Sequence, residues 1–121
     1  MLEPGFIEEC SQIAVKAAGA SSREILSVIA SSDEDLNIKS KKDGSLVSDA
    51  DYASQKVIEV VLSPLQIPIL SEEASIPDYD ERITWNYYWL IDPLDGTESF
   101  LESRSGFAVN ISLCDKSGPI I

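Results

Sequence analysis

The chain has 121 residues, of which 44% are hydrophobic, so it can bury one core and is too short for several domains. Its 21 Asp and Glu against 9 Lys and Arg give a net charge of −12, which disfavours direct binding to a nucleic-acid polymer or an anionic membrane surface. It contains no histidine, which excludes Ser-His-Asp and Cys-His nucleophile systems and His-ligated zinc.

The first predicted element is helical. Pro4 suits a first helical turn, and Gly19 interrupts the apolar pattern that follows. The segment is therefore either one long helix kinked near Gly19 or two short helices, and it ends near Ser31. The residues expected in the core at three- and four-residue spacing are Phe6, Ile7, Cys10, Ile13, Ala14, Ala17, Ala18, Ile25, Leu26 and Ile29.

A second helix is predicted after a short strand at residues 36–39 and a turn at Asp43-Gly44. Ser48 suits the N-cap of this helix, with Asp51 at the capping-box position, and Pro64 ends the helix. The residues expected to be buried on it are Tyr52, Val57, Ile58, Val61 and Leu62.

Beyond Pro64 the pattern changes to strands, at residues 67–70, 87–91 and 107–113, the last with strict alternation. Residues 115–118 predict a hairpin turn, after which a fourth strand begins. Because an edge strand needs a partner, we expect either the N-terminal part of a longer protein or a homodimer formed through this edge. The aromatic residues Trp85, Tyr87 and Tyr88 are interpreted as core or edge residues rather than as a platform for a base.

The two cysteines, Cys10 and Cys114, lie far apart and outside any C-x-x-C spacing. They indicate buried thiols of a reducing compartment, with a disulfide as the alternative. No segment approaches 18 consecutive apolar residues, and the N-terminus lacks the basic region of a signal peptide. We therefore expect a soluble, cytoplasmic protein.

The acidic residues are concentrated in one part of the chain. Residues 72–102 contain nine acids and one base, Arg82, and so carry two-thirds of the net charge. Residues 78–81 are typical of a solvated acidic loop. Asp92 and Asp95 instead interrupt a strongly apolar segment, which a solvated loop does not explain.

An apolar strand that ends at Asp92 predicts a cation site. Pro93 fixes a turn that brings the Asp95 carboxylate toward that of Asp92. Two carboxylates this close repel each other unless a cation or proton joins them, and hard oxygen ligands suit magnesium or calcium. Gly96 admits a close ligand, the backbone N–H groups after it suit an anion, and Thr97 adds a hydroxyl. A metal beside an anion pocket is the arrangement of phosphoryl chemistry.

Glu72 follows the apolar run at residues 67–70 in the same way, and supplies a third candidate carboxylate. Taken alone, a Glu-Glu pair after a strand is more often a surface feature. Beside a neighbouring strand that ends at Asp92, it favours a metal ligand.

The segment Trp89-Leu90-Ile91-Asp92-Pro93-Leu94-Asp95-Gly96-Thr97, with Phe100 after it, resembles the signature of the inositol monophosphatase superfamily. These magnesium-dependent, lithium-sensitive phosphatases include inositol monophosphatases and 3′(2′),5′-bisphosphate nucleotidases. Residues 41–51, 70–73 and 107–113 resemble, in the same order, the family's lysine-to-aspartate segment, metal-binding glutamate segment and following strand. The resemblance spans nearly the whole chain and covers the N-terminal half of the family.

Within the superfamily, Leu70-Ser71-Glu72-Glu73 and Val109-Asn110-Ile111 resemble the nucleotidase branch more closely. Glu98-Ser99-Phe100 departs from the Lys-Glu-Phe that is frequent in that branch. The resemblance implies hydrolysis of the 3′-phosphate of adenosine 3′,5′-bisphosphate or of its sulfated form. The alternatives are an inositol monophosphatase-like enzyme and a non-catalytic domain that binds metal ions or a partner protein.

The resemblance also implies a metal site of two or three Mg²⁺ ions. Glu72, Asp92 and the carbonyl of Leu94 would bind the first ion, and Asp92 with Asp95 would bind the second. Two ions stabilise both the attacking and the leaving oxygen of an in-line displacement.

By the same resemblance, the catalytic residues are Asp51, Thr97 and Glu72, with Thr97 and Asp51 orienting the attacking water. Gly96, Thr97 and Lys41 would bind the phosphorylated substrate. For Asp51 the alternative is a helix-cap partner of Ser48, and for Lys41 it is a solvated side chain.

The fold that the resemblance implies is α+β, a layered sandwich of N-terminal helices on a largely antiparallel sheet. Residues 1–121 would form the N-terminal metal-binding domain of a magnesium-dependent phosphatase. The C-terminal half of the family supplies a further metal-binding aspartate and most leaving-group contacts, and nothing here matches it. We therefore expect little activity from the isolated chain, a small phosphorylated substrate as its ligand, and no nucleic-acid polymer or membrane as a partner.

Overall fold

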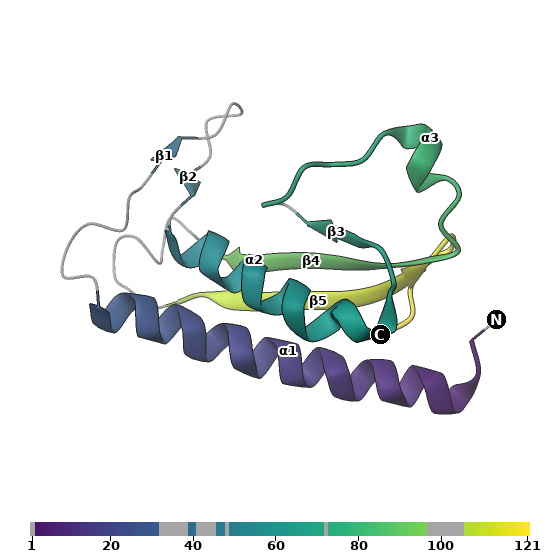
Figure 1. Cartoon of the computed structure of the whole chain (residues 1–121), viewed down its shortest axis with the longest axis horizontal. Helices are drawn as coiled ribbons and strands as arrows, with labels where there is room; N and C mark the ends of the chain where they lie inside the picture. Colours follow the sequence, from purple (N-terminus) through teal and green to yellow (C-terminus); the bar gives the residue numbers. More distant parts are fainter. Residues whose placement is uncertain (1, 32–38, 41–45, 48, 72, 97–105) are drawn as a thin grey trace.

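Two helices and a mixed sheet form two packed layers. The computed structural model describes residues 2–31, 39–40, 46–47, 49–71, 73–96 and 106–121. The helices α1 (Pro4–Ser31) and α2 (Asp49–Leu62) lie side by side and cover one face of a four-stranded sheet (Figure 1). The sheet order is β3 (Ile69–Ser71), β4 (Tyr87–Asp95), β5 (Ala108–Asp115) and β6 (Gly118–Pro119). The shorter elements are β1 (Lys39–Ser40), β2 (Leu46–Val47), the 3₁₀ turn η1 (Ser63–Leu65) and α3 (Tyr79–Arg82). The expected α+β layered sandwich is confirmed.

The four-stranded sheet is largely antiparallel, as expected. β4 pairs antiparallel with β5 and β5 pairs antiparallel with β6, whereas β3 runs parallel to β4. The predicted hairpin turn is confirmed by the pairing of Asp115 with Gly118. β1 and β2 form a separate antiparallel pair, and residues 36–38 of the strand predicted there lie outside the described part of the chain.

α1 is one continuous helix that passes through Gly19 and ends at Ser31, so of the two predicted alternatives the single long helix is confirmed and the two short helices are wrong. Its buried residues recur at helical spacing and end at Ile25. Leu26 was expected in the core and is exposed, because it lies about 100° round the helix from Ile25.

α2 presents an unusual buried face. Ile58 and Leu62 are buried as predicted, but Tyr52 is 47% exposed and its predicted burial is wrong. The face that meets the sheet follows the spacing of Asp51, Ser54, Gln55, Ile58 and Leu62, so its first half is polar and Tyr52 lies off it. α2 ends at Leu62, just before Pro64, as predicted.

The main core lies between the helices and the sheet around Trp89 of β4, which is 0% exposed. The indole N–H of Trp89 has no hydrogen-bond partner among the described residues. The other buried members of this cluster are Cys10, Ala17, Ile58, Leu62, Ile91 and Leu113.

Both cysteines are free and buried, which confirms the prediction of thiols rather than a disulfide. Burial, with a smaller contribution from the carboxylate of Glu9, raises the pKa of the Cys10 thiol. Among the described helices, none is long and apolar enough to cross a membrane.

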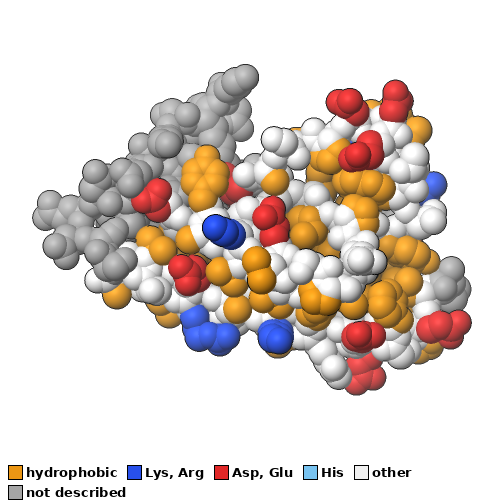
Figure 2. Space-filling model, in the orientation of Figure 1, with side chains coloured by type: hydrophobic (Ala, Val, Ile, Leu, Met, Phe, Trp, Pro, Cys, Tyr) orange, Lys and Arg blue, Asp and Glu red, His pale blue; other side chains and the backbone are white. Residues whose placement is uncertain are grey.

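The acidic segment at residues 78–81 is a short helix rather than the predicted loop. Asp78 is the N-cap of α3, and Asp80 and Glu81 lie in its first turn. All three side chains are exposed, and Figure 2 shows acidic side chains gathered on the surface over α3. The prediction that these acids are solvated is confirmed.

Adjacent residues of β4 allow a direct test of the core. Replacing Trp89 by Ala should lower the free energy of unfolding by about 3–5 kcal/mol, because it removes the largest buried side chain of the cluster. The matched change Leu90→Ala, on the opposite face and 44% exposed, should cost less than about 1 kcal/mol. Urea denaturation measures both, and equal losses would contradict this assignment of the two faces.

Candidate metal and phosphate site

Five of the predicted site residues are described by the structure: Asp51, Asp92, Leu94, Asp95 and Gly96. The other three, Lys41, Glu72 and Thr97, lie outside the described residues, so their predicted roles stay predictions.

The strand β4 does not end at Asp92, as the sequence analysis expected, but continues to Asp95. Its register against β5 shifts on the way, because Asp92 pairs with Asn110 and Asp95 pairs with Ala108. An advance of three residues along β4 is therefore opposite an advance of two residues along β5. This register shift is a β-bulge with one extra residue in β4. Proline lacks the N–H that a regular ladder would use, so Pro93 within the bulge fits its position.

The bulge brings the two aspartates to the same face of the sheet. On a regular strand, residues three apart point to opposite faces of the sheet. Asp92 and Asp95 are instead paired with Asn110 and Ala108, which are two apart on β5 and therefore point to the same face. A hydrogen bond agrees with this placement, since the Asn110 amide Nδ2 donates to Asp95 Oδ2 at 3.3 Å. The predicted turn at Pro93 is therefore wrong, since β4 continues through Pro93, and the two aspartates share a face because of the bulge.

The two carboxylates differ in surroundings. Asp92 is half-buried, and its Oδ1 accepts a hydrogen bond from the backbone N–H of Leu94 at 3.3 Å. Asp95 is exposed. Leu94 is buried against Ile25 of α1 and Ala50 of α2, which fixes the backbone that carries the predicted carbonyl ligand.

Gly96 has a positive φ of +88°, a region that L side chains rarely adopt. A Cβ atom at this position would lie 2.9 Å from the carbonyl oxygen of Gly106. Both observations explain why glycine stands directly after the aspartates.

α2 reaches the same region from the other side of the sheet. Asp51, in its first turn, is 0% exposed. An acidic residue in the first turn is also favourable for the helix dipole, so the catalytic and the capping interpretations of Asp51 both remain. One turn later, the buried hydroxyl of Ser54 donates a hydrogen bond of 2.6 Å to the carbonyl of Pro93 in the bulge.

A second connection joins α2 to the end of β3. The Ser71 hydroxyl, which is buried, donates to Gln55 Oε1, and it accepts a hydrogen bond of 3.3 Å from the backbone N–H of Glu73. Gln55 Nε2 in turn donates to Glu59 Oε1 at 2.6 Å.

Parallel pairing places the end of β3 beside the part of β4 that precedes Asp92. Ser71, the last residue of β3, is in register with Ile91, so the residues directly before Glu72 and Asp92 in the sequence are paired. β4 continues beyond this point to Asp95.

Ser54 and Gln55 are not among the residues predicted for the site. The signal in the sequence that could have found them is the spacing of Asp51, Ser54 and Gln55, three polar residues at positions i, i+3 and i+4 of one helix. On a helix that packs against a sheet, such a polar stripe marks buried hydrogen-bonding groups.

The described residues present oxygen ligands and no nitrogen or sulfur ligands at this edge. The carboxylates of Asp92 and Asp95 and the carbonyl of Leu94 are hard donors of the kind that magnesium prefers. Among the described residues there is no group of three or more acidic, histidine or cysteine side chains that could hold a metal ion. The third predicted carboxylate, Glu72, belongs to the residues that are not described.

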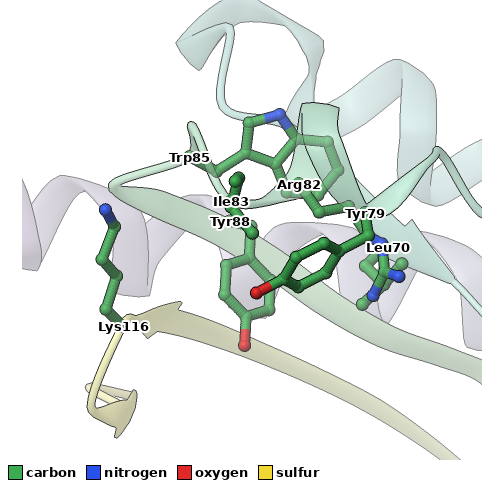
Figure 3. A pocket seen from close by; sticks show the side chains of 7 residues that line it. All are labelled: Leu70, Tyr79, Arg82, Ile83, Trp85, Tyr88 and Lys116. Carbon is green, nitrogen blue, oxygen red and sulfur yellow. The ribbon is translucent and has the colours of Figure 1, made fainter.

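A separate hollow lies near the start of β4, on the side of α3. Its volume is about 430 Å³, and its lining includes the aromatic side chains of Tyr79, Trp85 and Tyr88 (Figure 3). The rings of Trp85 and Tyr88 lie 6.2 Å apart, and the Arg82 guanidinium lies 5.9 Å from the ring centre of Tyr79.

The aromatic residues of this hollow contact one another and a neighbouring cation. Burial raises the pKa of Tyr88, and Cys114 adds to the shift. Tyr87, the third residue of the group interpreted as core or edge, packs against the main core, which confirms that interpretation for it. Tyr88 in this hollow lies four residues, or roughly 13 Å, along β4 from Asp92.

Comparison with known proteins identifies the family. The sequence model of the inositol monophosphatase family matches residues 7–121. A 3′(2′),5′-bisphosphate nucleotidase CysQ from Buchnera aphidicola subsp. Acyrthosiphon pisum (strain APS) is 44% identical over 88 residues, which cover 71% of this chain and 33% of the relative. The CysQ of Escherichia coli (strain K12) is 43% identical over 88 residues, covering 71% of this chain and 35% of the relative. The chain thus spans about a third of the length of these curated relatives.

Solved structures show the same fold. The crystal structure of CysQ from Bacteroides thetaiotaomicron, described as a bacterial member of the inositol monophosphatase family, matches with a TM-score of 0.77 and 32% identity. The match covers 93% of this chain and 40% of that one. The extragenic suppressor protein suhB from Bartonella henselae matches with a TM-score of 0.75 and 29% identity, covering 89% of this chain and 41% of that one.

The close approach at Gly96 can be tested by substitution. Gly96→Ala should lower the free energy of unfolding by about 2–4 kcal/mol, because it combines an unfavourable φ with a clash against the Gly106 carbonyl. Gly118→Ala is the control, since Gly118 also has a positive φ but a Cβ there meets nothing within 4 Å. It should cost less, about 1–3 kcal/mol, because only its backbone conformation is strained. Thermal or urea unfolding compares the two, and an equal cost would show that the close approach at Gly96 is unimportant.

Proposed function

The chain belongs to the inositol monophosphatase family, and on this premise we propose that it forms the metal-binding part of a magnesium-dependent phosphomonoesterase. The observation that carries the proposal is the bulge in β4, which turns the carboxylates of Asp92 and Asp95 to one face directly before Gly96. The proposed ions are two or three Mg²⁺, with Glu72 as a further ligand at the end of β3.

We propose as substrate adenosine 3′,5′-bisphosphate, or its sulfated form, with hydrolysis of the 3′-phosphate. Support comes from the curated relatives, which are named as 3′(2′),5′-bisphosphate nucleotidases and are 43–44% identical over the matched segment. Ser71 adds support, because the Leu-Ser-Glu-Glu segment of this chain resembles the nucleotidase branch.

In the proposed mechanism each residue at the strand ends has one task. Asp92, Asp95 and the Leu94 carbonyl would hold magnesium, and the bound ion would supply positive charge to the attacking and leaving oxygens. Gly96 lets the backbone approach the phosphate closely, and Thr97 adds its hydroxyl. Asp51, together with Thr97, orients the attacking water and accepts its proton. A buried carboxylate at that place is suited to this task as a general base.

An inositol monophosphatase-like activity is the second candidate. The sequence observation that favours it is Glu98-Ser99-Phe100, which departs from the pattern frequent in the nucleotidase branch. The chemistry at phosphorus is the same in both candidates, so only the leaving group separates them.

The prediction that a C-terminal domain completes the second metal site and the leaving-group contacts stays a prediction. We propose the cytoplasm as the compartment, because Cys10 and Cys114 are both unpaired and a reducing environment preserves such thiols.

The test is phosphate release by the full-length protein, with and without Mg²⁺. Adenosine 3′,5′-bisphosphate should be hydrolysed in preference to inositol 1-phosphate, with lithium as an inhibitor. Asp92→Asn should reduce kcat/KM by at least about 100-fold, because a carboxylate ligand of the proposed metal site is lost. The control Asp80→Asn, which changes an exposed aspartate on α3, should leave the rate unchanged. Turnover that needs no divalent ion and survives Asp92→Asn would contradict the proposal.

A further inference from the structure

We propose that Ser54 and Gln55, adjacent residues of α2, are positioning residues that set the affinity of the metal site by holding the ends of β4 and β3. The inference rests on the proposed function, since it concerns the residues behind the proposed ligands. Neither side chain is offered as a ligand or as a catalytic group.

Ser54 holds the bulge of β4. Its side chain is 0% exposed, and its hydroxyl donates to the Pro93 carbonyl at 2.6 Å. Pro93 stands between Asp92, whose carboxylate is a proposed ligand, and Leu94, whose carbonyl is another. A bulge leaves one residue without a regular ladder partner, so its backbone orientation depends on other contacts. The Ser54 hydroxyl supplies such a contact at the peptide unit between the two ligands.

Gln55 holds the end of β3 through a hydrogen-bond chain whose direction is fixed. An ionised Glu59 carboxylate only accepts hydrogen bonds, so the amide nitrogen of Gln55 has to face it. The amide oxygen of Gln55 is then left to accept from the Ser71 hydroxyl. The Ser71 oxygen in turn accepts the backbone N–H of Glu73.

These hydrogen bonds connect Ser71 and Glu73, which flank position 72 in the sequence, to the side-chain amide of Gln55 on α2. Rotation of the Gln55 amide would place its oxygen opposite the Glu59 carboxylate, so that two acceptors would face each other. The series of hydrogen bonds therefore has one favourable arrangement.

The two contacts come from consecutive residues, so they share one helical turn. Because α2 also carries Asp51 on the same face, its position relative to the sheet couples the proposed water-orienting carboxylate to both strand ends. Metal ligands have to be held to within about 0.5 Å, and groups that orient ligands change metal affinity by about 10–100-fold when they are removed. Buried hydrogen bonds with a merely structural role would change stability but not metal affinity.

The experiment measures the dissociation constant for Mn²⁺, used as the probe ion, by titration calorimetry on the full-length protein, together with the melting temperature of the metal-free form. Ser54→Ala and Gln55→Met should each raise the Mn²⁺ dissociation constant by about 10-fold. The control Ser63→Ala also removes a serine-to-carbonyl hydrogen bond, to Val60, but lies at the far end of α2, and it should leave the constant unchanged.

A charge-neutral exchange keeps the test independent of simple destabilisation. In the double variant Gln55→Glu with Glu59→Gln, the amide at position 59 donates to the carboxylate at position 55, which still accepts from Ser71. The double variant should therefore bind Mn²⁺ within about threefold of the wild type, whereas Gln55→Met does not.

Unchanged Mn²⁺ affinity in Ser54→Ala and Gln55→Met, even with a lower melting temperature, would overturn the proposal. Failure of the exchanged pair to restore affinity would overturn the hydrogen-bond chain through Gln55. A wild-type protein that binds no Mn²⁺ and releases no phosphate would overturn the proposed function instead, so the two failures are distinguishable.

Discussion

The register shift between β4 and β5 is the constraint on which the candidate site depends. Without the extra residue between Asp92 and Asp95, the two carboxylates would point to opposite faces of the sheet. With the extra residue, both carboxylates point to the same face, and Gly96, which follows directly, has a positive φ. The bulge interrupts the regular ladder, and the Ser54 hydroxyl on α2 meets the carbonyl that lies within it. The bulge in β4, the Ser54 contact from α2 and the backbone conformation of Gly96 therefore together determine the geometry of the candidate site.

The negative charge of the chain is located partly at the candidate site and partly on the exposed surface. Two-thirds of the net charge of −12 lies in residues 72–102, and part of it, on α3, is exposed to solvent. Asp92 is different, because it is half-buried beside the buried Leu94. Two carboxylates on one face are unfavourable without a cation, so the negative charge there suits a metal site and, through the metal, a phosphate.

The sequence predicted much of the fold because hydrophobic spacing is strong in α1 and β5 and in the second half of α2. Residues such as Cys10, Ile58 and Leu113 lie where their periodicity places them. The prediction failed at Tyr52, because the first half of α2 buries mainly polar side chains, and the spacing of large apolar residues alone cannot detect that face. It also ended β4 too early. Proline usually interrupts a strand, and only the pairing with β5 reveals that a bulge accommodates it.

For the site, the sequence predicted metal ligands around Asp92, and the structure shows that Asp92, Leu94 and Asp95 all lie on β4, while their roles as ligands stay predictions. The roles of Ser54 and Gln55 required three-dimensional contacts, since their partners lie 39 and 16 residues away in the sequence. The most direct test of the account is a crystal structure of the full-length protein with Mn²⁺, located by its anomalous scattering. We expect an ion in direct contact, at about 2.1 Å, with the Asp92 carboxylate and the Leu94 carbonyl. Mn²⁺ bound elsewhere, with neither oxygen in contact, would contradict it.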